Sequence, residues 1–265
     1  MESTNPVFKR GYAAMGSSRG STMTATPADV DSLNDLYNAP AASSTRTGRM
    51  TIDDVVIRTS ILFAVLVAVG AFAWNANLGG GFLLIGFVGG LVLGMINSFK
   101  ANISAPLVIA YAAFEGLALG VLSHMYETTY PGIISQAVIG TLAAFVGILF
   151  AYKSKKIRVT PKFTRVMIGA MTGYFVLGIV SLIAGFAGVG QGMGFYGVSG
   201  LGLLLAVAGV AFASFFLVLD FDMIENMIKN GAPNQESWRA GFGLMVTVVW
   251  LYLEVLRLIS ILRRD

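Results

Sequence analysis

The segment VSGLGLLLAVAGVAFASFFLVLDFD, residues 198–222, indicates the fold class of this chain. Apolar residues dominate it from end to end and do not alternate with polar ones, which is typical of a membrane-spanning helix and not of a barrel strand. A helix needs about 20 mostly apolar residues to cross a hydrocarbon core about 30 Å thick. This segment is long enough to do so.

Six further runs have the same character, at residues 55–75, 81–99, 104–126, 131–152, 165–187 and 237–262. The chain as a whole is 55% hydrophobic and only 12% charged, which is too apolar for an ordinary soluble domain. We therefore expect an all-α integral membrane protein, a bundle of seven transmembrane helices formed by residues 51–265.

Residues 1–50 differ in composition, being rich in Ser, Thr, Ala, Gly and Pro and lacking an apolar run. Such a segment cannot bury enough apolar surface to fold, so we expect a disordered tail. Thr51 and Asp54 in TIDD then have the spacing of a capping box, which predicts the start of the first helix.

Small residues recur at four-residue spacing in three spans, which predicts close helix packing. They are Gly86, Gly90 and Gly94 in the second span, Gly116 and Gly120 in the third, and Gly169 and Gly173 in the fifth.

Basic residues occupy alternate connections between the spans and predict the orientation of the chain. One set of connections carries them: the segment before the first span, Lys100, residues 153–165, and Lys229 with Arg239. The alternate connections, residues 76–80, 127–131 and 187–197, contain no Lys or Arg. We expect a protein of the cell membrane whose N-terminus lies in the cytoplasm. The net charge of +4 thus reflects topology and attraction to anionic lipid, not nucleic-acid binding.

Four acidic residues lie within the spans: Glu115, Asp220, Asp222 and Glu254. A charge at the bilayer centre costs about 2.5–3.5 kcal/mol or more, so acids held there are candidates for function. At a rise of 1.5 Å per residue, Glu115 lies about 16 Å from its cytoplasmic end, and the two aspartates lie about 12–15 Å from theirs.

The depth of Glu254 depends on where the last helix begins. A start at Ser237 places Glu254 about 25 Å deep and out of reach of Asp222, whereas a start near Leu244 places it about 15 Å deep, level with the other acids. Because Gly241 and Gly243 interrupt the segment, we prefer the later start.

Two carboxylates that meet in a low-dielectric interior share one proton and titrate near physiological pH. We expect Asp222 and Glu254 to form such a pair, with Glu115 and Asp220 as secondary acids and Arg257 as a counter-ion. When deprotonated, the pair offers oxygen ligands that suit Ca²⁺.

The sequence contains no nucleophile–base pair, no His-based metal motif and no cofactor fingerprint. We therefore expect a protein that is not an enzyme and has no tightly bound cofactor.

Three motifs carry a family resemblance: FEGLALG at 114–120, LDFDMI at 219–224 and LYLEVL at 251–256. With seven spans in this order, the chain resembles the bacterial branch of the Bax inhibitor-1 (transmembrane Bax inhibitor motif) family. The resemblance implies a fold with a central last helix and a pair of aspartates on helices six and seven that senses pH and gates a calcium leak. These positions fall on Asp222 and on Glu254, where glutamate replaces the aspartate of the family.

The first hypothesis for function is accordingly a pH-sensitive leak for Ca²⁺ or other cations. A second is a regulator without transport activity that binds a membrane protease or another partner through its cytoplasmic loops. A third is a proton-coupled transporter, because buried carboxylates also serve in proton relays.

Overall fold

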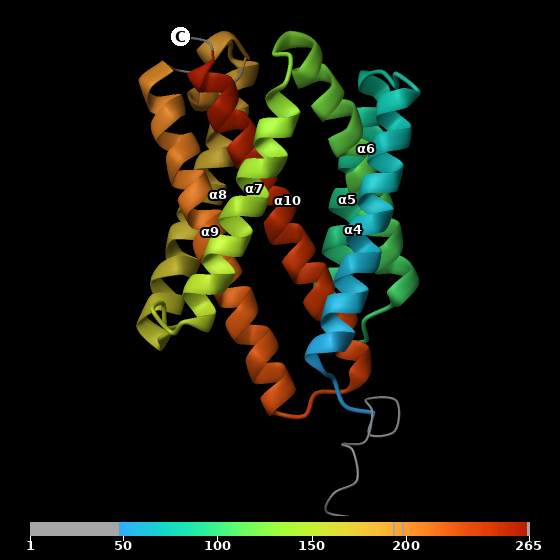
Figure 1. Ribbon diagram of the computed structural model, residues 1–265. Helices are drawn as coiled ribbons and strands as arrows, with labels where there is room; N and C mark the ends of the chain where they lie inside the picture. Colours follow the sequence, from blue (N-terminus) through green and yellow to red (C-terminus); the bar gives the residue numbers. More distant parts are fainter. Residues whose placement is uncertain (1–47, 193, 198, 264–265) are drawn as a thin grey trace, which may run out of the picture. The chain divides into compact units, whose positions relative to one another are not determined.

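Seven helices cross the membrane in the part of the chain that the computed structural model describes, residues 48–192, 194–197 and 199–263 (Figure 1). They confirm an all-α, multi-pass membrane protein. Their bounds are α4 (Ile52–Asn75), α5 (Gly80–Phe99), α6 (Ala105–Thr129), α7 (Ile133–Lys153), α8 (Pro161–Phe186), α9 (Ser199–Lys229) and α10 (Ser237–Leu262). Short 3-10 turns precede α9 (η1, Val189–Gly192; η2, Gly194–Gly197) and α10 (η3, Asn234–Glu236).

The first helix begins where the capping box predicts. The Asp54 backbone N–H donates to the Thr51 hydroxyl, and the Thr51 backbone N–H donates to the Asp54 carboxylate at 3.0 Å. Two of the free N–H groups at the start of α4 are thereby satisfied.

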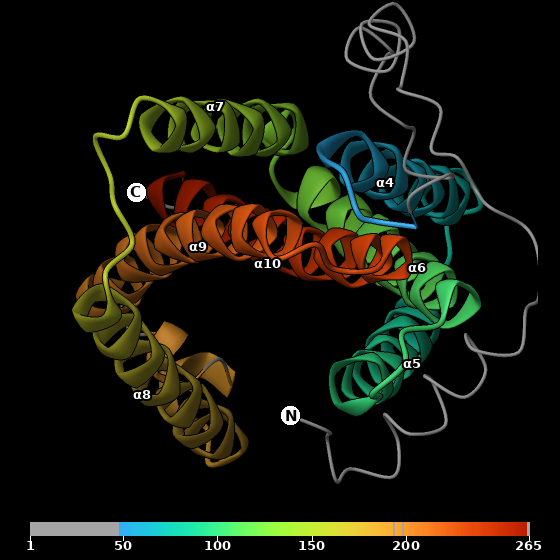
Figure 2. The ribbon, with the colours of Figure 1, turned by 90° about the horizontal axis from the view of Figure 1, so that it is seen from below.

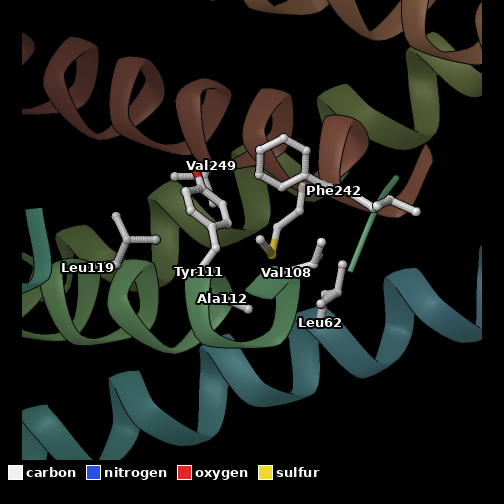
Figure 3. Close-up of a cluster of buried hydrophobic side chains, with 9 residues drawn as sticks. Leu62, Val108, Tyr111, Ala112, Leu119, Phe242 and Val249 are labelled. Carbon is white, nitrogen blue, oxygen red and sulfur yellow. The ribbon is translucent and has the colours of Figure 1, made fainter. Parts of the chain in front are cut away.

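The last helix is the centre of the bundle. α10 packs against α4, α6, α7 and α9, and Figure 2 shows it running between α7 and α9 on one side and α4 and α6 on the other. One apolar cluster joins α10 to α4 and α6 (Figure 3), where the rings of Tyr111 and Phe242 meet edge to face with centroids 5.0 Å apart. A second cluster joins α10 to α7 and α9 around Leu217 and Leu251.

Close packing at small residues is confirmed for two of the three spans. A Cβ added to Gly116 would lie 2.4 Å from the Leu66 carbonyl oxygen, and one added to Gly120 would lie 2.3 Å from that of Gly70, so α4 and α6 touch through their backbones. The prediction is wrong for Gly169 and Gly173, where an added Cβ meets no atom within 4 Å.

The folded unit begins earlier than residue 51. The Met50 N–H donates to the Ala232 carbonyl at 2.8 Å, the Gly48 carbonyl accepts from the Asn234 N–H at 2.8 Å, and Met50 is only 2% exposed. Residues 48–50 therefore pack against the α9–α10 connection, and the predicted tail boundary at residue 50 is wrong. The rest of the predicted tail lies outside the described residues.

The last helix begins at Ser237, so the preferred start near Leu244 is also wrong. Gly241 and Gly243 lie inside α10, and a Cβ on Gly241 would come 3.1 Å from the Thr59 hydroxyl of α4. Gly241 therefore serves close helix packing and does not break the helix.

Arg58 fixes this end of α10. Its guanidinium, half-buried on α4, donates to the backbone carbonyl and the side-chain oxygen of Asn234 and to the Ser237 hydroxyl. It also lies over the Trp238 ring, 5.3 Å from the centroid. One basic side chain thus connects the first span to the start of the last.

The other end of α10 lies at the connection that lacks Lys and Arg. Arg263 donates to the Pro131 carbonyl at 2.8 Å. α10 therefore begins beside the start of α4 and ends at the opposite side of the bundle, as an odd number of crossings requires.

Candidate functional site

Glu254 is a buried acid held by side chains from two helices. It is 6% exposed, and its Oε1 accepts hydrogen bonds from the Tyr174 hydroxyl at 2.7 Å and from the Trp250 indole N–H at 3.2 Å. Tyr174 lies on α8, whereas Trp250 lies one turn before Glu254 on α10. The other carboxylate oxygen faces a cation.

That cation is Arg257, whose Nη2 lies 3.2 Å from Glu254 Oε2. Arg257, the expected counter-ion of an Asp222–Glu254 pair, thus contacts Glu254. The guanidinium also lies over the Tyr196 ring, 4.4 Å from its centroid, an arrangement that favours a desolvated cation. Among the described residues, Glu254 Oε2 and Arg257 Nη2 have no aligned hydrogen-bond partner, so the pair is held by charge and packing.

The pair lies at the middle of a span. Tyr174 lies at the midpoint of α8, and a Cβ on Gly209 of α9 would lie 2.4 Å from the Glu254 carboxyl carbon. Although Glu254 is about 25 Å along its own helix, its neighbours place it deep in the bundle. The glycine leaves the space that the carboxyl group occupies.

Asp222 does not meet Glu254. Its Oδ2 accepts from Asn226 at 2.9 Å, and its neighbour Met223 lies 3.9 Å from the position of a Cβ on Gly243. Gly243 lies eleven residues before Glu254, which corresponds to about 16 Å along α10. The expected carboxylate pair is therefore not formed, because the early start of α10 and the length of α9 place the two acids at different levels.

Asp220 lies between the level of Asp222 and the level of Glu254. Its carboxyl lies beside the Thr247 hydroxyl of α10, seven residues or about 10 Å before Glu254. Asp220 Oδ2 is buried and has no hydrogen-bond partner among the described residues. It is an acid in the α9–α10 interface without a neutralising partner in that part of the chain.

Glu115 belongs to a different helix pair. Its Oε1 lies 3.0 Å from the position of a Cβ on Gly90, so the side chain fills space between α5 and α6. It does not join the acids of α9 and α10.

A cavity of about 1130 Å³ lies beside Asp222. It reaches from the α7–α8 connection to the middle of α7, with Asp222, Glu225 and Tyr152 at its polar end and Thr141 at its deep end. Tyr152 donates to Glu225 at 2.5 Å, and Glu225 pairs with Lys229 at 2.5 Å.

The sequence matches the family described as Bax inhibitor 1 like over residues 5–264, which is almost the entire chain. The chain belongs to the Bax inhibitor 1 like family. No curated protein matches it. The family match also covers most of the segment that we assigned to the tail.

In this Bax inhibitor 1 like protein, the acids are spaced out along a helix pair and not gathered at one point. Within the described ranges, no group of three or more His, Cys, Asp or Glu side chains lies close enough to hold a metal ion. The Ca²⁺ site expected of Asp222 and Glu254 is not assembled, because Asp222 of α9 lies near the level of Gly243, about 16 Å from the level of Glu254 along α10.

Sequence reasoning missed three residues that shape the Glu254 site: Tyr174, Trp250 and Gly209. Trp250 lies one turn before Glu254 on the same helix face, so its contact with the acid could have been predicted from the sequence. Tyr174 and Gly209 come from other helices, and a lone tyrosine or glycine in an apolar span does not reveal which acid it meets.

Proposed function

We propose that this Bax inhibitor 1 like protein is a pH-sensitive leak for Ca²⁺ in the cytoplasmic membrane, with its N-terminus in the cytoplasm and with Glu254 and Arg257 as the gate. The proposal depends on the series of acidic residues along the α9–α10 pair. Asp222 lines the large cavity, Asp220 lies in the helix interface, and Glu254 lies deepest.

The series supports a cation route because Asp222 and Asp220 each lower the cost of a cation at their own level. A cation in a bilayer interior lacks the hydration that water provides, and carboxylate oxygens replace part of it. Asp220 Oδ2, buried and without a partner among the described residues, is the group best placed to do this between the cavity and Glu254.

The Glu254–Arg257 pair supports a gate because its net charge depends on one proton. With Glu254 ionised, the carboxylate offsets the guanidinium 3.2 Å away, and an entering cation meets a neutral pair. With Glu254 protonated, the positive charge of Arg257 is no longer offset and repels Ca²⁺. Acidification therefore closes the route in this proposal.

Ca²⁺ uptake into vesicles that contain the purified full chain tests the proposal. We expect uptake above that of protein-free vesicles, lower uptake at acidic pH, and a reduction of at least tenfold for Asp220→Asn. The matched control is Glu115→Gln, which removes a spanning acid from a different helix pair and retains the uptake. Uptake equal to that of protein-free vesicles at every pH overturns the proposal, and Ca²⁺ movement that drives stoichiometric counterflow of protons identifies a proton-coupled transporter instead.

A further inference from the structure

The large cavity is an apolar groove with a basic end. Its walls come from α4 and α7, which are not among the helix pairs that pack together, and its floor comes from α9 and α10. Most of the lining is apolar, including Val56, Phe63, Leu142, Phe145, Leu149 and Val248. Since α4 and α7 both span the membrane, the apolar part of the groove lies at the depth of the lipid chains.

The basic end lies where α7 finishes and the connection to α8 begins. Lys153, Lys155 and Arg158 line the cavity there, and all three are exposed. None of them takes part in the ion pairs found among the described residues.

The acids of the groove already have partners. Glu225 is bound by Lys229 and by the Tyr152 hydroxyl, each at 2.5 Å, and Asp222 accepts from Asn226 at 2.9 Å. Lys155 also interacts electrostatically with Glu225, and the neutral Asn226 amide leaves the charge of Asp222 in place. The lining at this end nevertheless has four basic side chains and two acidic ones, so an excess of positive charge is available to an anion.

The length of the groove suits a lipid chain. Thr141, at the deep end, and Lys153, at the basic end, are twelve residues apart on α7, which corresponds to about 18 Å. Half of a typical hydrocarbon core is about 15 Å thick. A lipid whose headgroup lies at the basic end therefore has room to extend an acyl chain as far as Thr141.

We propose that this groove binds one anionic phospholipid, with an acyl chain between α4 and α7 and the headgroup phosphate at Lys153, Lys155 and Arg158. The apolar walls recognise the chain, and the three basic side chains favour an anionic headgroup over a zwitterionic one. The proposal concerns binding alone and does not depend on ion flux.

Native mass spectrometry of the full chain with phosphatidylglycerol or phosphatidylcholine measures the headgroup preference. We expect Lys153→Gln/Lys155→Gln/Arg158→Gln to lower the preference for phosphatidylglycerol about tenfold. The control Lys156→Gln/Lys162→Gln/Arg165→Gln removes the same charge from neighbouring exposed positions that do not line the groove, and it keeps the preference. Equal losses in the two triple variants overturn the proposal, because they indicate general attraction to a basic loop.

A photoreactive residue in place of Leu142 tests the position of the lipid chain. In vesicles that mix both lipids, we expect adducts at Leu142 to be enriched in phosphatidylglycerol. A photoreactive residue in place of Ile168, an exposed apolar position of α8, forms adducts with no such preference. Adducts between Leu142 and residues 1–47 overturn the proposal, because they indicate that this segment of the chain and not a lipid occupies the groove. Adducts at Leu142 with no more phosphatidylglycerol than those at Ile168 overturn it as well.

Discussion

The Glu254 carboxylate and the Arg257 guanidinium approach to 3.2 Å from adjacent turns of the central helix. Both groups are largely buried, with side-chain exposures of 8% for Glu254 and 20% for Arg257. A charge that loses its partner in such a place is more costly than the absence of both charges.

Glu254→Gln and Arg257→Gln each leave one buried charge without its partner, so we expect each to lower the free energy of unfolding by about 3–5 kcal/mol. The double variant removes both charges and should lose less than the sum of the two single variants, by at least 1 kcal/mol as a rough bound. Thermal unfolding of the purified protein measures this double-mutant cycle. Additive losses would mean that the two side chains do not interact.

Tyr174→Phe removes the hydroxyl that donates to Glu254 at 2.7 Å and leaves the ring in place. Hydrogen bonds to charged groups are typically worth about 1.5–3 kcal/mol, so we expect a stability loss in this range. Tyr196→Phe is the matched control, since the ring that lies over Arg257 is retained and no hydrogen bond of the Tyr196 hydroxyl is found among the described residues. Chemical unfolding curves compare the two, and equal effects would contradict the assigned role of Tyr174.

Gly209→Ala places a methyl group 2.4 Å from the Glu254 carboxyl and 2.7 Å from the Tyr174 hydroxyl. Because Glu254 must move, we expect loss of its contact with Arg257 and a destabilisation of about 1–3 kcal/mol from overpacking. Gly173→Ala, on α8 with nothing within 4 Å, should be neutral or slightly stabilising. Wild-type stability in Gly209→Ala would show that this space is not filled by Glu254.

Arg58→Gln removes the side chain that connects α4 to the α9–α10 connection. We expect faster hydrogen exchange across residues 230–240, with little change near Glu254, because the lost contacts lie at the start of α10. The control Arg165→Gln removes an exposed arginine at the start of α8. Unchanged exchange in Arg58→Gln would contradict the role given to this residue.

The seven spans, the helix start at Thr51 and the contact between Arg257 and Glu254 were predictable because each depends on residues close together in sequence. Hydrophobic runs set the spans, and the cap and the ion pair act over three residues of one helix.

The pairing of Asp222 with Glu254 was not predictable in the same way, because it depends on the register between two helices. A rise of 1.5 Å per residue gives the depth of a residue only when the helix start is known. Two closely spaced glycines such as Gly241 and Gly243 are typical of a helix break. Here Gly241 packs against α4, and the helix continues through both residues. Tyr174 and Gly209 then complete a different site around Glu254.

The sign of the change in Ca²⁺ flux distinguishes a Glu254–Arg257 gate from a pair that only stabilises the bundle. In vesicles at neutral pH, Glu254→Gln leaves the positive charge of Arg257 without its offset and should lower uptake, whereas Arg257→Gln leaves the negative charge of Glu254 and should raise it. We expect changes of at least tenfold in opposite directions at matched protein density. Changes in the same direction, or wild-type uptake in both variants, would contradict the assignment of this pair as the gate.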